Sequence, residues 1–225
     1  MLACIYDVHG NLPALEAVLD DARSAGADAF VLGGDYALMG GWPAETVARL
    51  RTLEPARWIR GNVDRWTADP DAAPEFLHAA VATCAAALGA ETTAELGALP
   101  ETAEVADWMV VHGSPLSDVR GFAPEADETD EELLAGARPV RLMFGHTHVQ
   151  FTRTAHGVEL LNPGSVGMPV DGDHRAAYAL IGDGVELRRV AYDHLASAAK
   201  VRALADGADW GEVAAQRIER AEFVT

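Results

Sequence analysis

The chain has 225 residues, of which 35 are Asp or Glu and 17 are Lys or Arg, so its formal net charge is −18. A surface this acidic repels phosphate backbones, which nucleic-acid-binding proteins neutralise with clustered Lys and Arg, and a long nucleic acid is therefore excluded as the expected partner. The hydrophobic content of 49% favours a globular chain with a sizeable core over a disordered one.

Cysteine usage and the apolar runs predict the compartment. Cys4 and Cys84 are expected to be buried thiols, which is typical of a reducing compartment and not of a disulfide scaffold. Asp7 and His9 interrupt the first apolar run, which argues against a signal peptide. No apolar run approaches the ~20 residues that a membrane span needs. The prediction is a cytoplasmic protein that does not enter a membrane.

Short β-rich runs alternate with helical stretches in the first third of the chain. Strands are predicted over residues 2–6, 29–32 and 58–60, and helices over 12–25 and 44–53. Such βαβαβ alternation predicts a parallel sheet with crossover helices. Because ligands bind outside the carboxyl ends of such strands, the polar residues that follow them are the first candidates for a site.

The remainder of the chain is predicted to be mixed. The Ala-rich residues 74–99 are expected to form two helices separated at Gly89, and Gly182-Asp183-Gly184 marks a β-hairpin. Further strands are predicted over 105–111, 141–144, 158–161, 177–181 and 185–190, and helices over 195–205 and 210–223.

An acidic segment, Glu125–Glu132, carries six acids in eight residues and has two interpretations. It could be a metal site, but Thr129 and Glu132 have the spacing of a capping box that opens a helix containing Leu133. Acids in a first helical turn also complement the helix dipole. We therefore predict a solvated helix start.

Five of the predicted strands end in a motif with potential metal ligands and a glycine. In an extended segment residues i and i+2 point the same way, so Asp7 with His9, and His146 with His148, can each direct two side chains to one place. Imidazole, carboxylate and amide oxygen together suit Mn, Fe, Zn or Ni better than Mg or Ca. The motifs are Asp7-Val8-His9-Gly10-Asn11, Gly33-Gly34-Asp35, Gly61-Asn62-Val63-Asp64, His112-Gly113 and Gly145-His146-Thr147-His148.

The number of ligands predicts two metal ions, because one structural zinc takes only four. Asp35 is the expected bridge, since a carboxylate can join two ions ~3.5–4 Å apart. Single histidines are more often packed or exposed side chains than ligands, and that interpretation is kept for His78, His156, His174 and His194. The predicted metal ligands are Asp7, His9, Asp35, Asn62, His112, His146 and His148.

Taken in order, these motifs resemble those of the calcineurin-like metallophosphoesterase superfamily, and more closely those of a bacterial branch of small stand-alone phosphoesterases. The likeness covers nearly the whole chain and continues through residues 162–167 and 171–176. It implies an α/β fold, a four-layer αββα sandwich of two mixed sheets flanked by helices. Residues 1–225 would form this sandwich as a single metallophosphoesterase domain.

The resemblance also implies a division of the ligands and a mechanism. One metal would be held by Asp7, His9, Asp35 and His148, and the second by Asp35, Asn62, His112 and His146. A hydroxide bridging the metals would attack phosphorus in line, with Asp35, Asn62 and Asp64 as catalytic residues. Manganese is the expected cofactor, with iron, zinc or nickel as alternatives.

One position departs from the family pattern. Many relatives carry a His after the Gly-Asn pair, which protonates or stabilises the leaving oxygen, and this chain has Val63 there. General acid catalysis is typically worth ~10²–10⁴-fold. We therefore expect a phosphodiesterase or phosphomonoesterase that acts on small or activated substrates such as aryl esters.

Three polar residues near the motifs keep two interpretations each. Asp64 either orients water or Arg65 or serves as a loop cap. Asn11 either contacts a substrate phosphate or caps the helix that follows it. Arg175 either reaches an anionic substrate or forms a surface ion pair.

Substrate choice is expected to lie in the loops over residues 36–42, 65–74 and 114–124, where Trp42 and Trp66 could stack on a base or aryl group or simply pack. The expected partner is a small phosphoester, and a homo-oligomer is compatible with the sequence. The competing hypothesis is a catalytically weak or inactive metal-binding scaffold for protein interactions, which only Val63 favours. A third hypothesis is a hydrolase or sensor that binds a single metal ion.

Overall fold

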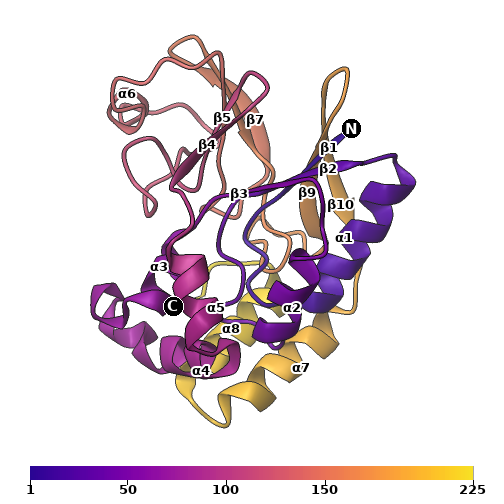
Figure 1. Cartoon of the computed structure of the whole chain (residues 1–225), viewed down its shortest axis with the longest axis vertical. Coiled ribbons are helices and arrows are strands. Elements are labelled where there is room, and N and C mark those ends of the chain that lie inside the picture. The colour runs from indigo at the N-terminus through magenta and orange to yellow at the C-terminus, as the bar shows by residue number, and fades with distance from the viewer. Residues whose placement is uncertain (225) are drawn as a thin grey trace.

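Two five-stranded sheets lie face to face in the computed structural model, which describes residues 1–224 (Figure 1). The strand order of the first sheet is β10-β9-β1-β2-β3, and that of the second is β4-β5-β6-β8-β7. The first sheet contains β1 (Leu2–Ile5), β2 (Ala29–Leu32), β3 (Ala56–Trp58), β9 (Ala176–Ile181) and β10 (Val185–Val190). The second contains β4 (Thr102–Val105), β5 (Trp108–Val111), β6 (Arg141–Met143), β7 (Phe151–Ala155) and β8 (Val158–Asn162).

Both sheets are mixed, and parallel strands form the centre of each. In the first sheet β1 pairs with β2 and β2 with β3 in parallel, whereas β9 runs antiparallel to β1 and β10. In the second, β5, β6 and β8 are parallel, and β4 and β7 pair antiparallel at the edges. Carboxyl ends of parallel strands meet at one edge, so the loops after β1, β2, β5 and β6 can converge.

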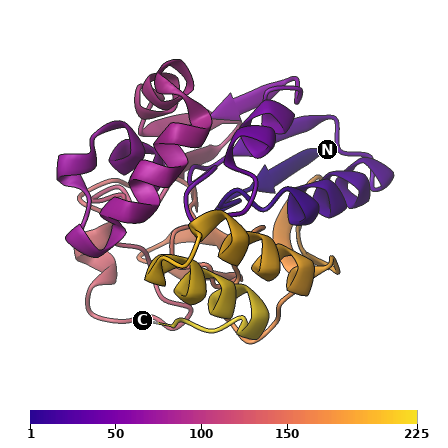
Figure 2. The same ribbon diagram turned by 90° about the horizontal axis from the view of Figure 1, so that it is seen from below.

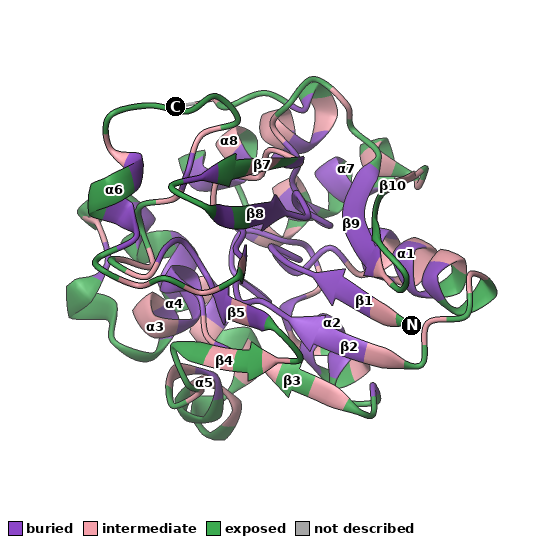
Figure 3. Ribbon diagram, turned by 90° about the horizontal axis from the view of Figure 1, so that it is seen from above, coloured by how far each residue is buried: buried purple, intermediate pink, exposed green. Residues whose placement is uncertain are grey.

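Three hydrophobic clusters separate four layers of structure. Side chains alternate along β1, so that Ile5 packs against the helices while Cys4 and Tyr6 point between the sheets. In the second sheet Met143 faces the same inter-sheet layer, whereas Leu142 faces outward. This arrangement confirms the predicted α/β class with two mixed sheets. Figure 3 shows the central strands as largely buried, whereas the edge strand β4 alternates between exposed and intermediate residues.

Helices cover the outer face of the first sheet. They are α1 (Leu12–Ser24), α2 (Pro43–Leu50), α3 (Asn62–Ala68), α4 (His78–Leu88), α5 (Ala90–Gly97), α7 (His194–Ala205) and α8 (Asp209–Arg220), with short 3₁₀ turns η1 (Pro70–Ala72) and η2 (Glu75–Leu77). On the outer face of the second sheet, Leu133 of the short helix α6 (Asp130–Leu133) packs into a hydrophobic cluster with Leu142 and Leu160 of the sheet. The predicted break at Gly89 is confirmed: its φ of 78° lies in the left-handed region, where glycine is tolerated.

Three local predictions are wrong or incomplete. Residues 105–111 do not form one strand, because the chain turns at Ala106 and Asp107 between β4 and β5. The strand β7 and the helix α3 were not predicted at all. The capping box is also wrong, since Thr129 Oγ1 donates to Asp127 Oδ1 at 2.6 Å and Glu132 pairs with Arg120.

The expected burial of both cysteines is confirmed, and Cys4 and Cys84 are free thiols. Within residues 1–224, no helix combines the length and the apolar character that crossing a membrane would require.

Candidate metal centre

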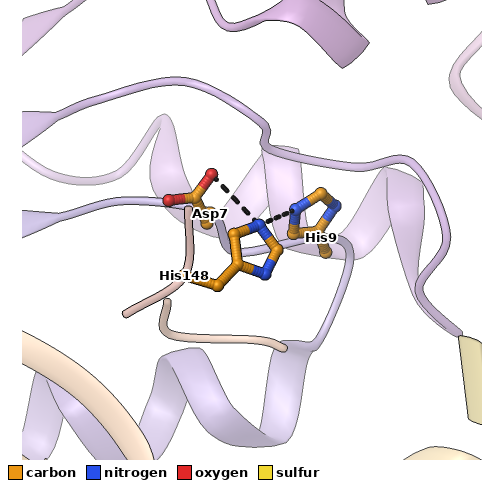
Figure 4. A group of neighbouring side chains, drawn as sticks. All are labelled: Asp7, His9 and His148. Carbon is orange, nitrogen blue, oxygen red and sulfur yellow. Dashed lines mark hydrogen bonds and ion pairs between the residues drawn. The ribbon is translucent and has the colours of Figure 1, made fainter. Parts of the chain in front are cut away.

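Six of the predicted ligands form two clusters at the ends of strands from both sheets. Asp7, His9 and His148 make one cluster, which Figure 4 displays. Asp35, His112 and His146 make the other, and within each cluster the ligand atoms lie within 4.8 Å of one another. The loops after β1 and β2 supply Asp7, His9 and Asp35, and those after β5 and β6 supply His112, His146 and His148.

The backbone at five of these six residues is in the left-handed region, with φ of 53° at Asp7, 46° at His9, 59° at Asp35, 64° at His146 and 59° at His148. The expectation of extended segments is therefore wrong. Asp7 and His9 still reach one cluster, as predicted, whereas His146 and His148 turn into different clusters. Non-glycine residues in this region cost about 1–3 kcal/mol each and concentrate at functional sites. The fold therefore holds these side chains against a conformational cost.

Two glycines allow the carboxylates to approach the backbone closely. A Cβ on Gly61 would lie 2.1 Å from Asp35 Oδ1, and one on Gly145 would lie 2.5 Å from Asp7 Oδ2. Both distances are shorter than any real contact, so a side chain at either position would displace a carboxylate.

Backbone carbonyls fix the orientation of three imidazoles. The Nδ1 atoms of His9, His112 and His148 donate to carbonyl oxygens: those of Leu38 at 2.9 Å, Gly33 at 2.8 Å and Met168 at 2.6 Å. A ring nitrogen next to a carbonyl must carry the proton, so in the neutral rings each Nε2 presents a lone pair to the site. Such support is typical of histidines that ligate metals.

Two observations at the first cluster fit a cation. His9 Nε2 and His148 Nε2 face each other at 3.0 Å, so two lone pairs meet when both rings are neutral. Asp7 is fully buried, and its Oδ1 has no hydrogen-bond partner although it lies 3.5 Å from His148 Nε2. A buried acceptor without a donor is costly, and a divalent cation would satisfy all three atoms.

Asn62 brings an amide oxygen to the second cluster in the same way. Its Oδ1 lies 3.0 Å from His112 Nε2 and 2.9 Å from His146 Nδ1. Without a cation, these neighbours would favour a rotated amide that donates from Nδ2 to both rings. With a cation, the oxygen orientation lets three lone pairs converge. The donor set again fits a divalent metal.

Charges at the centre are strongly coupled. Burial opposes ionisation of Asp7 and Asp35, but the neighbouring histidines hold the pKa of each below its usual value. Burial also opposes protonation of His112, yet the Asp35 carboxylate raises its pKa to about 10. In contrast, burial lowers the pKa of His9 to about 4. A divalent cation at the centre would displace the proton of His112 and take its place beside the two buried carboxylates.

Asp64 holds the loop that carries Asp35. Its Oδ2 accepts the N–H groups of Asp35 and Gly61, both at 2.8 Å, and its Oδ1 accepts that of Tyr36 at 3.1 Å. Burial and then the Asp35 charge raise its pKa to about 7. Arg65 donates to Asp118 instead, so the hypothesis that Asp64 orients Arg65 is wrong. The geometry makes Asp64 a cap and a positioning residue.

The two predicted substrate residues are not at the centre. Asn11 is buried and caps α1, with its Oδ1 accepting from Ala14 N at 3.4 Å and its Nδ2 donating to the Gly167 carbonyl at 2.8 Å. These contacts match the helix-cap interpretation of Asn11, and Asn11 does not line the cavity at the centre. Arg175 is exposed and pairs with Asp173 at 2.6 Å, which matches the surface ion pair and not a substrate contact.

A cavity of about 990 Å³ opens onto the centre, and His9, Asp35, Asn62, His146 and His148 contribute to its lining. All three predicted specificity loops contribute, through Met39, Trp66 and the segment 119–121. Trp42 is not among the lining residues and lies instead beside Lys200.

Sequence reasoning missed the part of the lining formed by residues 76–77 and by α8 with the chain after it. These residues are mostly apolar, and no motif distinguishes them from core residues.

Comparison with known proteins places this geometry in context. Residues 1–183 match the model of the calcineurin-like phosphoesterase superfamily domain. A metallophosphoesterase from Sphaerobacter thermophilus has a crystal structure that is similar with a TM-score of 0.83, at 30% identity over 98% of each chain. A hypothetical protein from Pyrococcus horikoshii has the same fold, with a TM-score of 0.83 and 21% identity over 100% of each chain. An uncharacterized protein of Methanocaldococcus jannaschii is 28% identical over 86% of this chain and 88% of its own length.

Proposed function

The chain belongs to the calcineurin-like phosphoesterase superfamily, and we propose that it hydrolyses phosphate esters with two divalent cations at the candidate metal centre. The observation that carries this proposal is the pair of adjacent ligand clusters on the lining of one cavity. Asp7, His9, Asp35 and His148 would hold one cation. Asp35, Asn62, His112 and His146 would hold the other.

The unpartnered Asp7 Oδ1 and the facing imidazole nitrogens support this division. Asp35 Oδ2 lies 3.8 Å from His9 Nε2 and 3.3 Å from His112 Nε2, so one carboxylate reaches a histidine of each set. Manganese is the proposed ion, with iron, zinc or nickel compatible with the same donors.

When bound, two such cations would supply Lewis acidity and a nucleophile at neutral pH. The protein's own contribution is positioning, which is most of what phosphoryl transfer asks of an enzyme. The carbonyls of Leu38, Gly33 and Met168 hold three imidazoles in one tautomer, and Asp64 holds the peptide groups of Asp35 and Tyr36. The catalytic roles expected for Asp35 and Asn62 are therefore proposed as ligand roles.

Both sheets contribute ligands, which supports the proposal that residues 1–225 act as one domain. The two buried free thiols support a cytoplasmic location.

Metal content and turnover together test the proposed function. After reconstitution with Mn²⁺, we expect two metal equivalents per chain by elemental analysis and hydrolysis of bis(4-nitrophenyl) phosphate. Removal of the metal by a chelator should abolish turnover, and readdition of Mn²⁺ should restore it. One equivalent at saturation would indicate a single-metal site. Two equivalents without turnover of any aryl monoester or diester would favour the scaffold.

Val63 predicts a preference for activated substrates. The Val63 side chain lines the cavity and has no proton to donate to a leaving oxygen. In a Val63→His variant we expect the rate on a poor leaving group, such as an alkyl phosphodiester, to rise at least about tenfold, because general acids commonly contribute more than this. The rate on 4-nitrophenyl esters should change much less, since that leaving group needs no proton. An unchanged rate on the alkyl ester would show that the absent acid does not limit this enzyme.

A further inference from the structure

The cavity beside the candidate ligands points to a substrate class. We infer that the enzyme binds phosphate esters that carry a large apolar group, and that this group occupies the cavity while the phosphate lies at the metal centre. The inference rests on the proposed phosphoesterase function and extends it from the reacting atoms to the rest of the substrate.

The lining is apolar outside the centre itself. Twelve of the 18 lining residues other than the candidate ligands are apolar, among them Trp66, Leu77, Leu133, Met168, Trp210 and Val213. They come from α3, η2, α6, the loop before β9, and α8, so separate elements build one apolar surface. The volume of about 990 Å³ is at the upper end of ordinary ligand pockets and far exceeds what a phosphate group needs.

Exposed apolar side chains also gather at this cavity. Phe76, Phe223 and Val119 line it and are 77%, 69% and 42% exposed. These three residues are distant in sequence, and exposed apolar surface that gathers in one place is typical of a binding site. An apolar ligand group would remove this surface from water.

Charge at the lining disfavours a polyanionic substrate. Two of the described lining residues are cationic, Arg120 and Arg217, and the lining also includes the acidic residue Asp209. Arg120 is paired with Glu132 at 2.7 Å, and the guanidinium of Arg217 lies over the Phe223 ring at 4.3 Å. A nucleoside polyphosphate would need further cations for its additional phosphates. The apolar ester is therefore the better match.

Part of the apolar wall, Trp210, Val213 and Phe223, lies outside the family match, which ends at residue 183. Helix α8 packs against α7 and α4 (Figure 2) and supplies Asp209, Trp210, Val213 and Arg217 to the lining. The part of the wall that α8 supplies therefore carries none of the candidate ligands, so changes in α8 can alter specificity without altering the ligands.

A homologous substrate series tests the inference on Mn²⁺-reconstituted protein. Methyl, butyl and octyl 4-nitrophenyl phosphate share one leaving group, so only the apolar group changes along the series. Each buried methylene is worth about a factor of four, so burial of only about three of the seven methylenes added from methyl to octyl should raise kcat/KM at least about 60-fold. A flat series would overturn the inference even if all three esters are hydrolysed.

One double variant at the opening of the cavity, compared with a matched control elsewhere, locates the effect. In the Phe76→Ser, Phe223→Ser double variant we expect the octyl-to-methyl ratio of kcat/KM to fall at least about fivefold, because apolar surface at the opening is lost. Both side chains are exposed, so the fold should tolerate the change. Val140→Ser is the matched control, since Val140 is 66% exposed but does not line the cavity. An equal fall in the control would remove the evidence for this cavity.

Binding separates this inference from the proposed function. Methylphosphonate and octylphosphonate cannot be hydrolysed, and their affinities are measurable by calorimetry whether or not the protein turns over any ester. Octylphosphonate binding at least about 60-fold tighter, with no ester hydrolysed, would keep the apolar site and reject the phosphoesterase. Equal phosphonate affinities with normal ester hydrolysis would reject the apolar site alone.

Discussion

Replacing Asp35 by asparagine is expected to lower kcat/KM at least about 10³-fold and to reduce the metal content from two equivalents to one or fewer. Asn keeps the shape of the side chain and an oxygen that can accept the Val63 N–H, now at 3.0 Å from Asp35 Oδ1. It removes the charge that lies between His9 and His112. Loss of a group that merely supports a metal ligand already costs about 10–100-fold, so loss of a shared ligand should cost more.

The matched control for this variant is Asp71→Asn. Asp71 is an exposed carboxylate in η1 and does not line the cavity, so the same chemical change there should leave both metal content and rate at wild-type values. Elemental analysis and steady-state kinetics on both variants check the prediction. Two bound metals and a rate within tenfold of wild type in Asp35→Asn would exclude a bridging role.

The residues of this centre could be predicted because their chemistry is explicit in the sequence. Asp7, Asp35 and His112 each follow a predicted strand, Asp35 and His112 directly adjoin a glycine, and parallel strands bring such residues to one edge. What the sequence did not predict is their backbone conformation. Left-handed φ values at Asp7 and Asp35 depend on contacts from elsewhere in the fold, such as the Asp64 carboxylate that binds the Asp35 N–H.

The elements that sequence patterns missed lack the usual local signals. The turn between β4 and β5 uses Ala106 at a φ of 53°, a conformation for which a glycine would have been the signal. Helix α3 begins at Asn62, which the sequence pattern assigns to a metal-binding motif, so no helix start was predicted there. Strand β7 has a mixed exposure pattern and is defined by its pairing with β8, which no local pattern encodes.

The apolar lining residues outside the predicted loops could not be identified from the sequence, for a different reason. Phe76, Trp210 and Val213 are apolar residues in or near helices, and sequence alone does not separate an apolar residue that packs in a core from one that lines a pocket. Residues with explicit chemistry thus predicted the phosphoesterase class, whereas the apolar wall on which the proposed substrate class rests is formed only by the fold.

The Asp64→Ala substitution is expected to lower the stability of the protein strongly, because it removes three buried hydrogen bonds at once. The side chain is 2% exposed and accepts from the N–H groups of Asp35, Tyr36 and Gly61. An unsatisfied buried N–H costs about 1–3 kcal/mol, so three of them would cost about 3–9 kcal/mol, and we expect the free energy of unfolding to fall by at least about 3 kcal/mol. That is a large fraction of the ~5–15 kcal/mol by which native proteins are stable.

Denaturant unfolding in the presence of a chelator measures this loss without any contribution from bound metal. The matched control is Asp193→Ala, which removes an exposed carboxylate that accepts one N–H, from Ala196 at 2.9 Å, and should cost about 1 kcal/mol. Asp64→Asn should fall between the two, because one amide oxygen can still accept from Asp35 and Gly61 while its NH₂ group opposes the Tyr36 N–H. A loss in Asp64→Ala no larger than in the Asp193 control would mean that the loop carrying Asp35 is held by other contacts, and the positioning role of Asp64 would have to be abandoned.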